Sequence, residues 1–530
     1  MIYDQINKLV KESTDAVLGK SGQPFSLDCR AEWSDKADLS SSCALKLSRP
    51  LSLPPNKIAD QLLSNLGPSD LIEKVEVASP GFLNFTLKDA AILREVASID
   101  QNYGKKKDKG QKIQVEFISA NPTGPLTLGN ARGGFIGDVL ANVLENAGHQ
   151  VTREYYFNDA GTQISKLVES VKAAAGVISP EEVQYRGAYT LELAKKFNIE
   201  LGQKDDKELG RLLTKEIFER YIKGAIEKMN INFDEWFNES QLLNSGDFDK
   251  VLDRLKKEGI IYEKEGAVWL KPPADVPSER ERVLVKSNGD ITYLGTDIAY
   301  HLNIFEKRKF DKAVKVWGAD HAGQIVSLLK ALERLGHTDK LDFLIVQWVR
   351  LMKNGREFKI SKRAGTYVTV EELVDQVGAD VARYFIVRQA ATTHMDFDFD
   401  LAKEHSSKNP VYYVQYSYAR ASKLLQEAEN RKIEINKVKA SKFNHPAERK
   451  LAIELIKYPS LVSEVAGDYQ LQKLAGYAEH LAKIFHEFYE ECPIFRENQH
   501  TAERIFLVSK YRQVLQNLLK LIGVSAPESM

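Results

Sequence analysis

Apolar residues recur along this chain with two periods, and the change between them divides the chain into regions. Residues 57–66 carry one set at the spacing of an amphipathic helix: Ile58, Leu62, Leu63 and Leu66. Apolar and polar positions then alternate over residues 75–77 and 82–87, on either side of Ser79-Pro80-Gly81. This alternation predicts two strands joined by a turn, so roughly the first 100 residues predict a small α+β domain.

A polar, basic stretch at residues 101–112 interrupts the pattern and predicts a linker or surface loop, because it offers little to bury. A buried strand is predicted next, at 113–120, followed by a loop rich in proline and glycine and then by an amphipathic helix. Further strands are predicted between helical stretches at 281–286, 313–317 and 343–347. Alternating strands and helices are typical of a parallel sheet that binds a nucleotide.

Helical spacing dominates residues 166–258, which predict an insertion on that sheet, and strand signals vanish from about residue 370 onward. The predicted fold class is α/β, a Rossmann-type doubly wound parallel sheet with an α+β domain before it and an all-α bundle after it. We expect three domains, at residues 1–105, 106–370 and 371–530.

Composition then excludes several classes of protein. The balance of 74 basic and 74 acidic residues and the 43% of hydrophobic residues are ordinary for a soluble globular chain. No apolar run approaches the ~18 residues of a membrane helix, and the first residues lack the order of a signal peptide. Cys29, Cys43 and Cys492 are too few and too scattered for a disulfide framework or a zinc site. We therefore expect a soluble cytoplasmic protein without membrane contact and without side chains that bind a metal.

The loop at residues 121–134, NPTGPLTLGNARGG, has the features of a phosphate-binding turn. Its prolines stiffen the turn, and Gly129 allows a backbone to approach closely. The helix that follows directs its free N–H groups and its positive end toward the same point, which favours an anion such as phosphate. Spacing alone leaves a second interpretation equally open, a glycine-rich turn that binds nothing.

This loop and several later segments resemble the class I arginyl-tRNA synthetases, in which the loop reads NPTGPLHxGHARG. The other matching segments are REYYFNDAGTQI at 153–164, YRGAY at 185–189, FDEWFNES at 233–240, TYLGTDIAYH at 292–301, VWGADHAGQ at 316–324, KISKRAG at 359–365, NPVYYVQYSYAR at 409–420 and GVSAPESM at 523–530. The resemblance covers nearly the whole chain. It implies an enzyme that activates L-arginine with ATP and esterifies tRNA(Arg), usually with the tRNA already bound.

Two positions depart from the family pattern. Thr127 and Asn130 stand where the family has histidines that donate hydrogen bonds to the ATP phosphates. A hydroxyl and an amide can still donate, but as shorter, neutral groups, so we expect both residues to keep a weakened catalytic role. Losing one preorganised donor of this kind costs about 3–4 kcal/mol. The replacements therefore leave one alternative open, a tRNA-binding relative with impaired catalysis.

The segment KISKR at 359–363 resembles the family's KMSKS loop. The resemblance implies that Lys359 and Lys362 hold the leaving pyrophosphate as catalytic residues, with Mg²⁺ sharing the charge. Without the other motifs, a solvated basic loop would be the better interpretation. The resemblance also implies an ATP site formed by Gly129, Gly318, Asp320, His321, Gln347 and Ser361.

Recognition of arginine requires a buried carboxylate and an aromatic surface for the planar guanidinium. Tyr293 and Asp297 stand four residues apart at the start of a predicted helix, could share one face, and match the family's guanidinium-recognising pair. Without the family, a contact on a helix surface stays open. The resemblance further implies that the remainder of the substrate is held by Glu116, Ser119, Asn121 and Gln324. A class I enzyme for another amino acid is disfavoured by this pair and by the absence of CxxC zinc ligands.

The C-terminal region resembles the family's anticodon-binding bundle, and residues 1–100 resemble the extension that touches the tRNA elbow. Aromatics at 412–418 can stack on bases, although aromatics at helical spacing also serve as core. We expect tRNA contacts from Tyr416, Arg420 and Met530, and a monomeric enzyme. Acidic residues outnumber basic ones over 116–400, whereas basic residues are in excess over 101–115 and 401–530, which suits a cationic substrate and an RNA partner.

Overall fold

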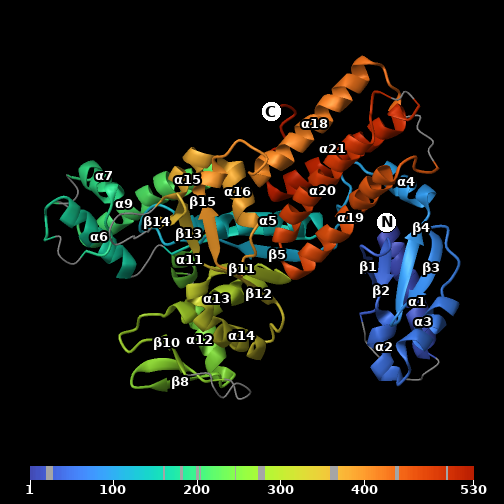
Figure 1. Ribbon diagram of the computed structural model, residues 1–530. Helices are drawn as coiled ribbons and strands as arrows, with labels where there is room; N and C mark the ends of the chain where they lie inside the picture. The colour runs from blue at the N-terminus through green and yellow to red at the C-terminus, as the bar shows by residue number, and fades with distance from the viewer. Residues whose placement is uncertain are drawn as a thin grey trace.

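The structure is a computed structural model that describes the chain except for residues 20–27, 159–161, 180–182, 199–201, 203, 245, 273–280, 359–367, 436–440 and 497–498. A five-stranded parallel sheet forms its centre (Figure 1). In spatial order its strands are β12 (Leu341–Val346), β11 (Lys312–Gly318), β5 (Lys112–Glu116), β6 (Gln150–Phe157) and β7 (Glu235–Asn238). The strand order runs outward from β5 in both directions, so the predicted doubly wound sheet is confirmed. Ligands of such sheets bind beyond the carboxyl ends of the strands where the order reverses, here between β5 and β11.

Helix α5 (Leu128–Asn146) follows β5 and lies between the sheet and the C-terminal helices (Figure 1). It is buried on nearly every side because apolar residues cover almost its whole circumference, among them Phe135, Ile136, Val139, Leu140, Val143 and Leu144. The rest of the sheet's helical cover comes from α13 (Tyr293–Leu302), the π-helical turn η2 (Asn303–Lys307), the 3-10 turn η3 (Ala319–Gln324) and α14 (Ile325–Arg334).

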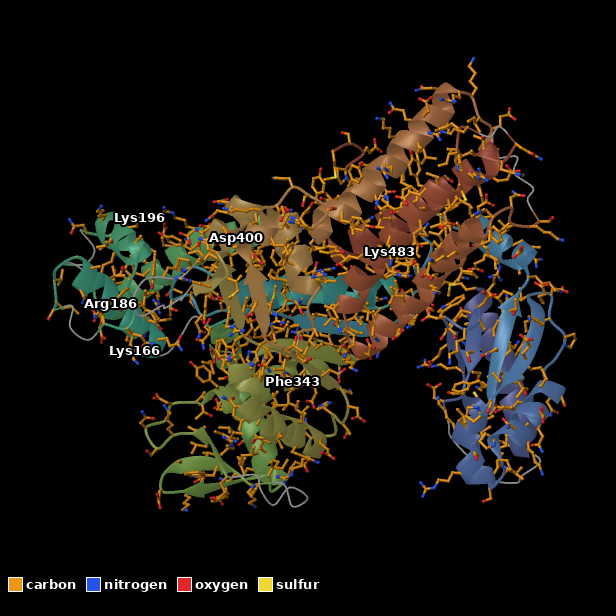
Figure 2. All side chains as sticks on the ribbon, in the orientation of Figure 1. Lys166, Arg186, Lys196, Phe343, Asp400 and Lys483 are labelled. Atoms are coloured by element: carbon orange, nitrogen blue, oxygen red, sulfur yellow. The ribbon has the colours of Figure 1, made fainter. Side chains whose placement is uncertain are left out.

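A helical arm extends to one side of the sheet (Figure 2), and Lys166, Arg186 and Lys196 lie on it. Its elements are α6 (Thr162–Ala174), α7 (Ala188–Lys196), α9 (Asp206–Glu216), the π-helical turn η1 (Ile217–Ile222) and α10 (Lys223–Lys228). The chain then returns to the main sheet as β7, a strand that the helical pattern of 166–258 did not indicate.

A small antiparallel sheet lies below the main sheet in Figure 1. It contains β8 (Ile261–Lys264), β9 (Ala267–Leu270) and β10 (Arg282–Val285), and it follows α11 (Glu239–Asn244) and α12 (Asp247–Lys257). The strand predicted at 281–286 is therefore present as β10, but it pairs with β9 rather than with the parallel sheet.

Beyond the sheet the chain forms β13 (Val349–Lys353), β14 (Arg356–Phe358), α15 (Val370–Val377), α16 (Ala379–Val387), β15 (Met395–Asp398) and α17 (Phe399–Ala402). The expectation that strands end near residue 370 is wrong, because β15 pairs in parallel with β13. The C-terminal bundle follows with four long helices: α18 (Pro410–Asn430), α19 (Pro446–Asp468), α20 (Gln472–Glu491) and α21 (Thr501–Ile522).

Arg383 of α16 joins three of these parts although it is only 1% exposed. Its guanidinium pairs with Asp138 of α5 and donates to the carbonyl oxygens of Met229 and Asn230, both 3.0 Å away, just beyond α10. It also donates to the carbonyl oxygen of Ile522, 3.3 Å away, at the end of α21. A buried arginine is tolerated here because its donors find partners.

The N-terminal domain comprises α1 (Ile2–Gly19), β1 (Ala31–Trp33), β2 (Leu39–Ser41), α2 (Cys43–Leu51), α3 (Pro55–Ser64), β3 (Ile72–Ala78), β4 (Phe82–Leu87) and α4 (Asp89–Ala97). The predicted helix at 57–66 and the predicted strand pair are confirmed as α3 and as the antiparallel pair β3–β4. The domain lies beside α19 (Figure 1), where Arg449 donates to the carboxylate of Asp38 over 2.8 and 2.7 Å.

Residues 101–112 are a surface segment, but they are tied down more firmly than their composition predicts. The Tyr103 side chain is buried, and its hydroxyl donates to Glu95 over 3.1 Å. The backbone N–H groups of Lys106 and Lys109 donate to the carbonyl oxygens of Asn146 and Gly148 over 2.8 and 2.7 Å. A single aromatic side chain and backbone hydrogen bonds therefore order a stretch that is otherwise polar.

Candidate active site

The backbone turns sharply where β5 ends, at the reversal point of the sheet. The predicted strand at 113–120 stops at Glu116, because Ile118 and Ser119 adopt φ values of +66° and +39°. Positive φ is costly for a β-branched residue and persists only where the surroundings enforce it, which is common at functional sites. Here the Ser119 hydroxyl oxygen accepts from the backbone N–H of Tyr156, 3.0 Å away. The turn thereby carries residues 121–134, the predicted phosphate-binding loop, across the end of the sheet. We call this segment the phosphate-type loop.

Tyrosines from neighbouring segments hold this loop. The hydroxyl of Tyr155 donates to the carbonyl oxygen of Ala120 over 2.9 Å, and that of Tyr189 donates to the carbonyl oxygen of Thr123 over 2.9 Å. A side chain at Gly124 would come within 3.0 Å of the Tyr189 ring, so glycine is needed there for close packing. The YRGAY segment therefore acts as a wall of the loop.

Thr127 and Asn130 cap helix α5 together. Thr127 is the N-cap residue, and the Asn130 side-chain oxygen accepts from both the backbone N–H and the hydroxyl of Thr127, each over 2.9 Å. The hydroxyl hydrogen of Thr127 is thus occupied, while the amide N–H groups of Asn130 make no hydrogen bond with the described residues. Asn130 is consequently the better placed of the two to donate to a phosphate.

The predicted KISKR loop cannot be placed, because Lys359, Ser361 and Lys362 lie outside the described residues. The segment after residue 367 is joined to the phosphate-type loop by a bridge between Thr369 and Thr127, and by the hydrogen bond from the N–H of Val370 to the carbonyl oxygen of Leu126, 2.9 Å away. The start of α15 therefore lies beside the N-terminal end of α5.

Arg132 of α5, which was not predicted from the sequence, stabilises the same end of the sheet. It is fully buried and donates to four carbonyl oxygens: those of Gln347 and Ala390 at 2.8 Å, Thr393 at 2.9 Å and Trp348 at 3.3 Å. Burial lowers the pKa of this guanidinium to about 10. Arg132 fixes the segment of Gln347, one of the residues expected at the ATP site, directly beside the cap of α5.

The other predicted ATP residues lie at two edges of this region. Gly129 is in the first turn of α5, and Gly318 ends β11. A side chain at Gly318 would come within 2.5 Å of the Asp320 carboxylate, so glycine lets that side chain fold back. Asp320 and His321 are exposed on η3, with 3.7 Å between the His321 Nε2 and the carboxylate. Their exposure leaves both groups available to a ligand.

A group of charged side chains fills the reversal point itself. Glu116 at the end of β5 forms an ion pair with Lys315 of β11, and both are buried. Burial raises the pKa of Asp297 on α13 to about 7, with the negative charges of Glu116 and Glu239 adding to the rise and the positive charge of Lys315 opposing it. Asp297 is therefore under the influence of two other carboxylates and one lysine.

Glu239 and Lys315 belong to this charged cluster but were not predicted from the sequence. Glu239 is buried directly after β7, and its charge also raises the pKa of Tyr293, after burial as the larger cause. Its position behind a short strand in the FDEWFNES match was one available signal. Lys315 was visible as a single charge within the apolar strand AVKVW, where an unpaired lysine would be costly.

The remaining predicted arginine contacts surround this cluster. Tyr293 and Asp297 lie one turn apart on α13, and the Tyr293 side chain is 54% exposed, so its ring is open to a ligand. Asn121 lies in the phosphate-type loop, Ser119 in the strained turn before it, and Gln324 at the N-cap of α14 on the far side of η3. The charge of Glu116 thus acts on Asp297, the charge of Glu239 acts on both Asp297 and Tyr293, and Gln324 lies toward the rim.

Two of the three predicted tRNA residues meet on one face of α18. The Arg420 guanidinium lies 5.0 Å from the ring centroids of both Tyr416 and Tyr489, and it donates to the Tyr416 hydroxyl over 2.9 Å. The rings of Tyr412 and Tyr416 stack at 6.3 Å. Met530 is exposed, but its terminal segment is held on another face, where the Gln415 amide donates to the carbonyl oxygen of Ser525 over 3.0 Å.

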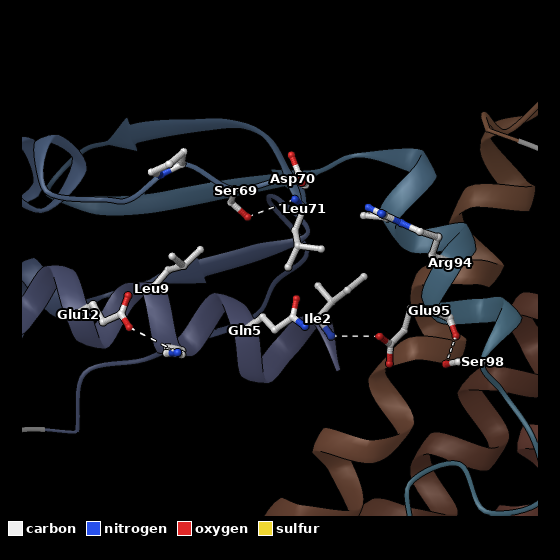
Figure 3. A pocket seen from close by; sticks show the side chains of 13 residues that line it. Ile2, Gln5, Leu9, Glu12, Ser69, Asp70, Leu71, Arg94, Glu95 and Ser98 are labelled. Carbon is white, nitrogen blue, oxygen red and sulfur yellow. Dashed lines mark hydrogen bonds and ion pairs between the residues drawn. The ribbon is translucent and has the colours of Figure 1, made fainter.

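Two other cavities lie away from this region. One, of about 600 Å³, opens in the N-terminal domain between α1 and α4 (Figure 3), and the carboxylate of Glu95 at its wall already accepts from the backbone N–H of Ile2 over 3.2 Å. The other, of about 470 Å³, lies beside residues 101–108. Within the described ranges, no cluster of three metal-ligating side chains occurs. Nor does the described part of the chain contain a helix long and apolar enough to cross a membrane.

A doubly wound sheet with a capped phosphate-type loop at its reversal point, flanked by a helical bundle, is the fold of the class I aminoacyl-tRNA synthetases. Three family models match in order: the arginyl-tRNA synthetase N-terminal domain at 4–87, the class I (R) tRNA synthetase catalytic domain at 92–398, and the DALR anticodon-binding domain at 414–530. The chain belongs to the arginyl-tRNA synthetase family.

Individual relatives agree with this assignment. The chain is 38% identical to an arginine–tRNA ligase of Heliobacterium modesticaldum, over 96% of this chain and 94% of that protein. It is 37% identical to the arginine–tRNA ligase of Acetivibrio thermocellus, over 100% and 99%. The arginyl-tRNA synthetase structure of Thermus thermophilus superposes with a TM-score of 0.82 at 22% identity, covers both chains completely and shows the same fold.

Proposed function

We propose that this chain joins arginine to tRNA(Arg) in two steps. ATP and L-arginine first give arginyl-adenylate and pyrophosphate, and the arginyl group then passes to the 3′-terminal adenosine of the tRNA. The observation that carries the proposal is the cluster at the sheet reversal, where the charges of Glu116, Glu239 and Lys315 all act on Asp297. Such a cluster fits a substrate that brings both a guanidinium and an ammonium group.

In the arginine pocket, Asp297 pairs with the guanidinium and the exposed Tyr293 ring covers it. Glu239 supplies a second carboxylate, since its charge reaches both of these residues. Glu116, Ser119 and Asn121 hold the α-amino end of the substrate, with Gln324 at the rim. Lys315 is a positioning residue that orients Glu116 through their ion pair.

On the ATP side, the N-terminus of α5 faces the phosphates, and Asn130 donates to them while Thr127 orients Asn130. Lys359 and Lys362 follow the pyrophosphate as it leaves, because a long flexible stem can track moving charge. The nucleotide is held by Gly129, Gly318, Asp320, His321, Gln347 and Ser361. Mg²⁺ bound with ATP shares the phosphate charge, and no zinc is required.

The outer domains bind the tRNA. Tyr416 and Arg420 offer a stacking surface to unpaired bases, Met530 lies on the terminal segment, and the N-terminal domain contacts the tRNA body. We assign residues 1–105, 106–370 and 371–530 to these three tasks, in a cytoplasmic enzyme that acts as a monomer. The comparisons lend no support to the alternative of a relative with impaired catalysis.

Charging of total tRNA with each amino acid in turn tests this function. We expect arginine alone to be attached, and Asp297→Asn to abolish charging while the folded protein persists. The exposed Asp249→Asn on α12 is the matched control and should charge normally. Attachment of another amino acid, or full charging by Asp297→Asn, would remove arginine recognition from this pocket.

A further inference from the structure

The N-terminal domain contains a pair of thiols outside the synthetase site. Strands β1 and β2 pair in antiparallel register, with Ala31 opposite Ser41, and the residues before β1 continue alongside the first turn of α2, which begins at Cys43. The chains stay adjacent there, because the Ser41 hydroxyl donates to the carbonyl oxygen of Arg30 over 3.1 Å and the Cys43 sulfur lies 3.9 Å from the same oxygen. On the other side of Cys29, the carbonyl oxygen of Asp28 accepts from the ammonium of Lys46, so both neighbours of Cys29 contact the segment that begins at Cys43.

We propose that Cys29 and Cys43 are a modification site, a dithiol that a hydroperoxide converts into a disulfide. Each thiol is the largest cause of the shift in the pKa of the other, raising that of Cys29 and lowering that of Cys43. Cys29 is partly exposed while Cys43 is buried, so a small oxidant reaches the pair from the side of Cys29.

The surroundings of Cys43 suit a thiolate. Cys43 is the first residue of the nine-residue helix α2, and the positive end of a helix stabilises negative charge. The hydrogen bond from Cys29 is the largest cause that lowers the pKa of Cys43, followed by the Ser41 hydroxyl and the ammonium of Lys46. Lys46 is kept nearby because it donates to the carbonyl oxygen of Asp28 over 2.8 Å.

The chemistry balances in two steps. The Cys43 sulfur attacks one peroxide oxygen as its thiolate, the O–O bond breaks, and one water leaves with the proton that Cys43 has given up, so Cys43 becomes a sulfenic acid. The Cys29 sulfur then attacks the Cys43 sulfur, the S–O bond breaks, and a second water leaves with the Cys29 hydrogen. The two cysteines lose two electrons and two hydrogens in total, and the peroxide is reduced to two waters.

The disulfide would close the base of a hairpin that docks the N-terminal domain. At the other end of this hairpin the Trp33 indole N–H donates to the Ser460 hydroxyl over 2.7 Å, and Asp38 accepts from Arg449, both on α19 (Figure 1). Oxidation should therefore slow the opening of the hairpin that joins this domain to the bundle. Cys492 is buried between α20 and α21, far along the chain, and serves as an internal reference.

The test treats the reduced full-length protein with hydrogen peroxide, alkylates it, and maps its peptides without reduction. We expect one cross-linked pair, Cys29 with Cys43, two hydrogens lighter than the separate peptides, and a fall from three free thiols to one that a dithiol reductant reverses. Three thiols after treatment, oxidation of Cys43 that stops at sulfinic acid, or a cross-link to Cys492 would each overturn the proposal.

Variants and hydrogen exchange sharpen the result. Cys43→Ser should lose no thiol pair, whereas Cys492→Ala should still lose two thiols, since its only change lies elsewhere. The backbone amides of residues 31–41 should exchange more slowly in the oxidised protein than in the reduced protein. Equal exchange in the two forms would overturn the link between the disulfide and the docking hairpin.

Discussion

Arginine binding should weaken in acid because the pocket must hold an ionised Asp297. Its pKa is raised to about 7, chiefly by burial and then by the charges of Glu116 and Glu239 against Lys315. A guanidinium pairs with the carboxylate and competes with the proton. Between about pH 8 and about pH 6 the ionised fraction falls roughly tenfold, which corresponds to ~1.4 kcal/mol of arginine binding.

Calorimetric titration of the full-length protein with arginine measures this effect. The Kd should rise about tenfold over that pH interval, and at about pH 7 binding should release a fraction of a proton, seen by comparing buffers of different ionisation enthalpy. A Kd that is flat over the interval, or binding without proton release, would show that another group neutralises the guanidinium.

The raised pKa of Asp297 also affects the stability of the protein without arginine. A carboxyl group whose pKa is raised on folding favours the folded state at low pH, and that contribution is lost as the pH rises from 3.8 toward about 7. Asp297→Asn should therefore raise the free energy of unfolding near pH 8, by up to about 4 kcal/mol, and remove the stabilisation that arginine gives. A variant that is less stable than the parent at that pH would contradict the assigned cost of this buried charge.

Three further predictions concern other parts of the site. Asn130→Ala should lower the rate of adenylate formation about 100-fold, measured by pyrophosphate exchange with tRNA present. The double variant Thr127→His, Asn130→His should change this rate only modestly. A rise from an inactive to a fully active enzyme would refute the partial role of these residues. Arg132→Met leaves four carbonyl oxygens without their donor and should cost about 3 kcal/mol or more in urea unfolding, against a negligible change for the exposed Arg211→Met. Arg420→Ala should raise the KM for tRNA about 5- to 30-fold through lost stacking, with an unchanged Kd for arginine; an altered arginine Kd would argue for a structural role instead.

The sequence was most informative where period and composition agree over many residues. The doubly wound sheet, the paired strands before 87 and the helical bundle follow from apolar periodicity, because burial of one face decides these elements. Short strands escaped this reasoning. β7 and β15 each contain four residues, too few for a period to emerge, and β15 is recognisable only by its partner β13.

The site was predicted only as far as its motifs reached. The capping bond between Thr127 and Asn130 depends on a helix boundary that pattern alone locates poorly. Lys315 and Glu239 come close to Asp297 because β11 and β7 belong to the same sheet as β5, on opposite sides of it, and this neighbourhood exists only after folding. Arg132 binds carbonyl oxygens more than 200 residues away, a partnership that no local signal encodes.

The contacts of Arg383 affect how the molecule unfolds. The Arg383 guanidinium binds Asp138 of α5, the chain just beyond α10 and the last turn of the bundle, so separating any one of these parts leaves hydrogen-bonding groups of the others without a partner. Parts that are joined in this way do not unfold in separate thermal transitions. The sheet, the arm and the bundle should melt as one cooperative unit, and the helical bundle excised at residue 410 would forfeit the bond that its final carbonyl oxygen makes in the whole enzyme.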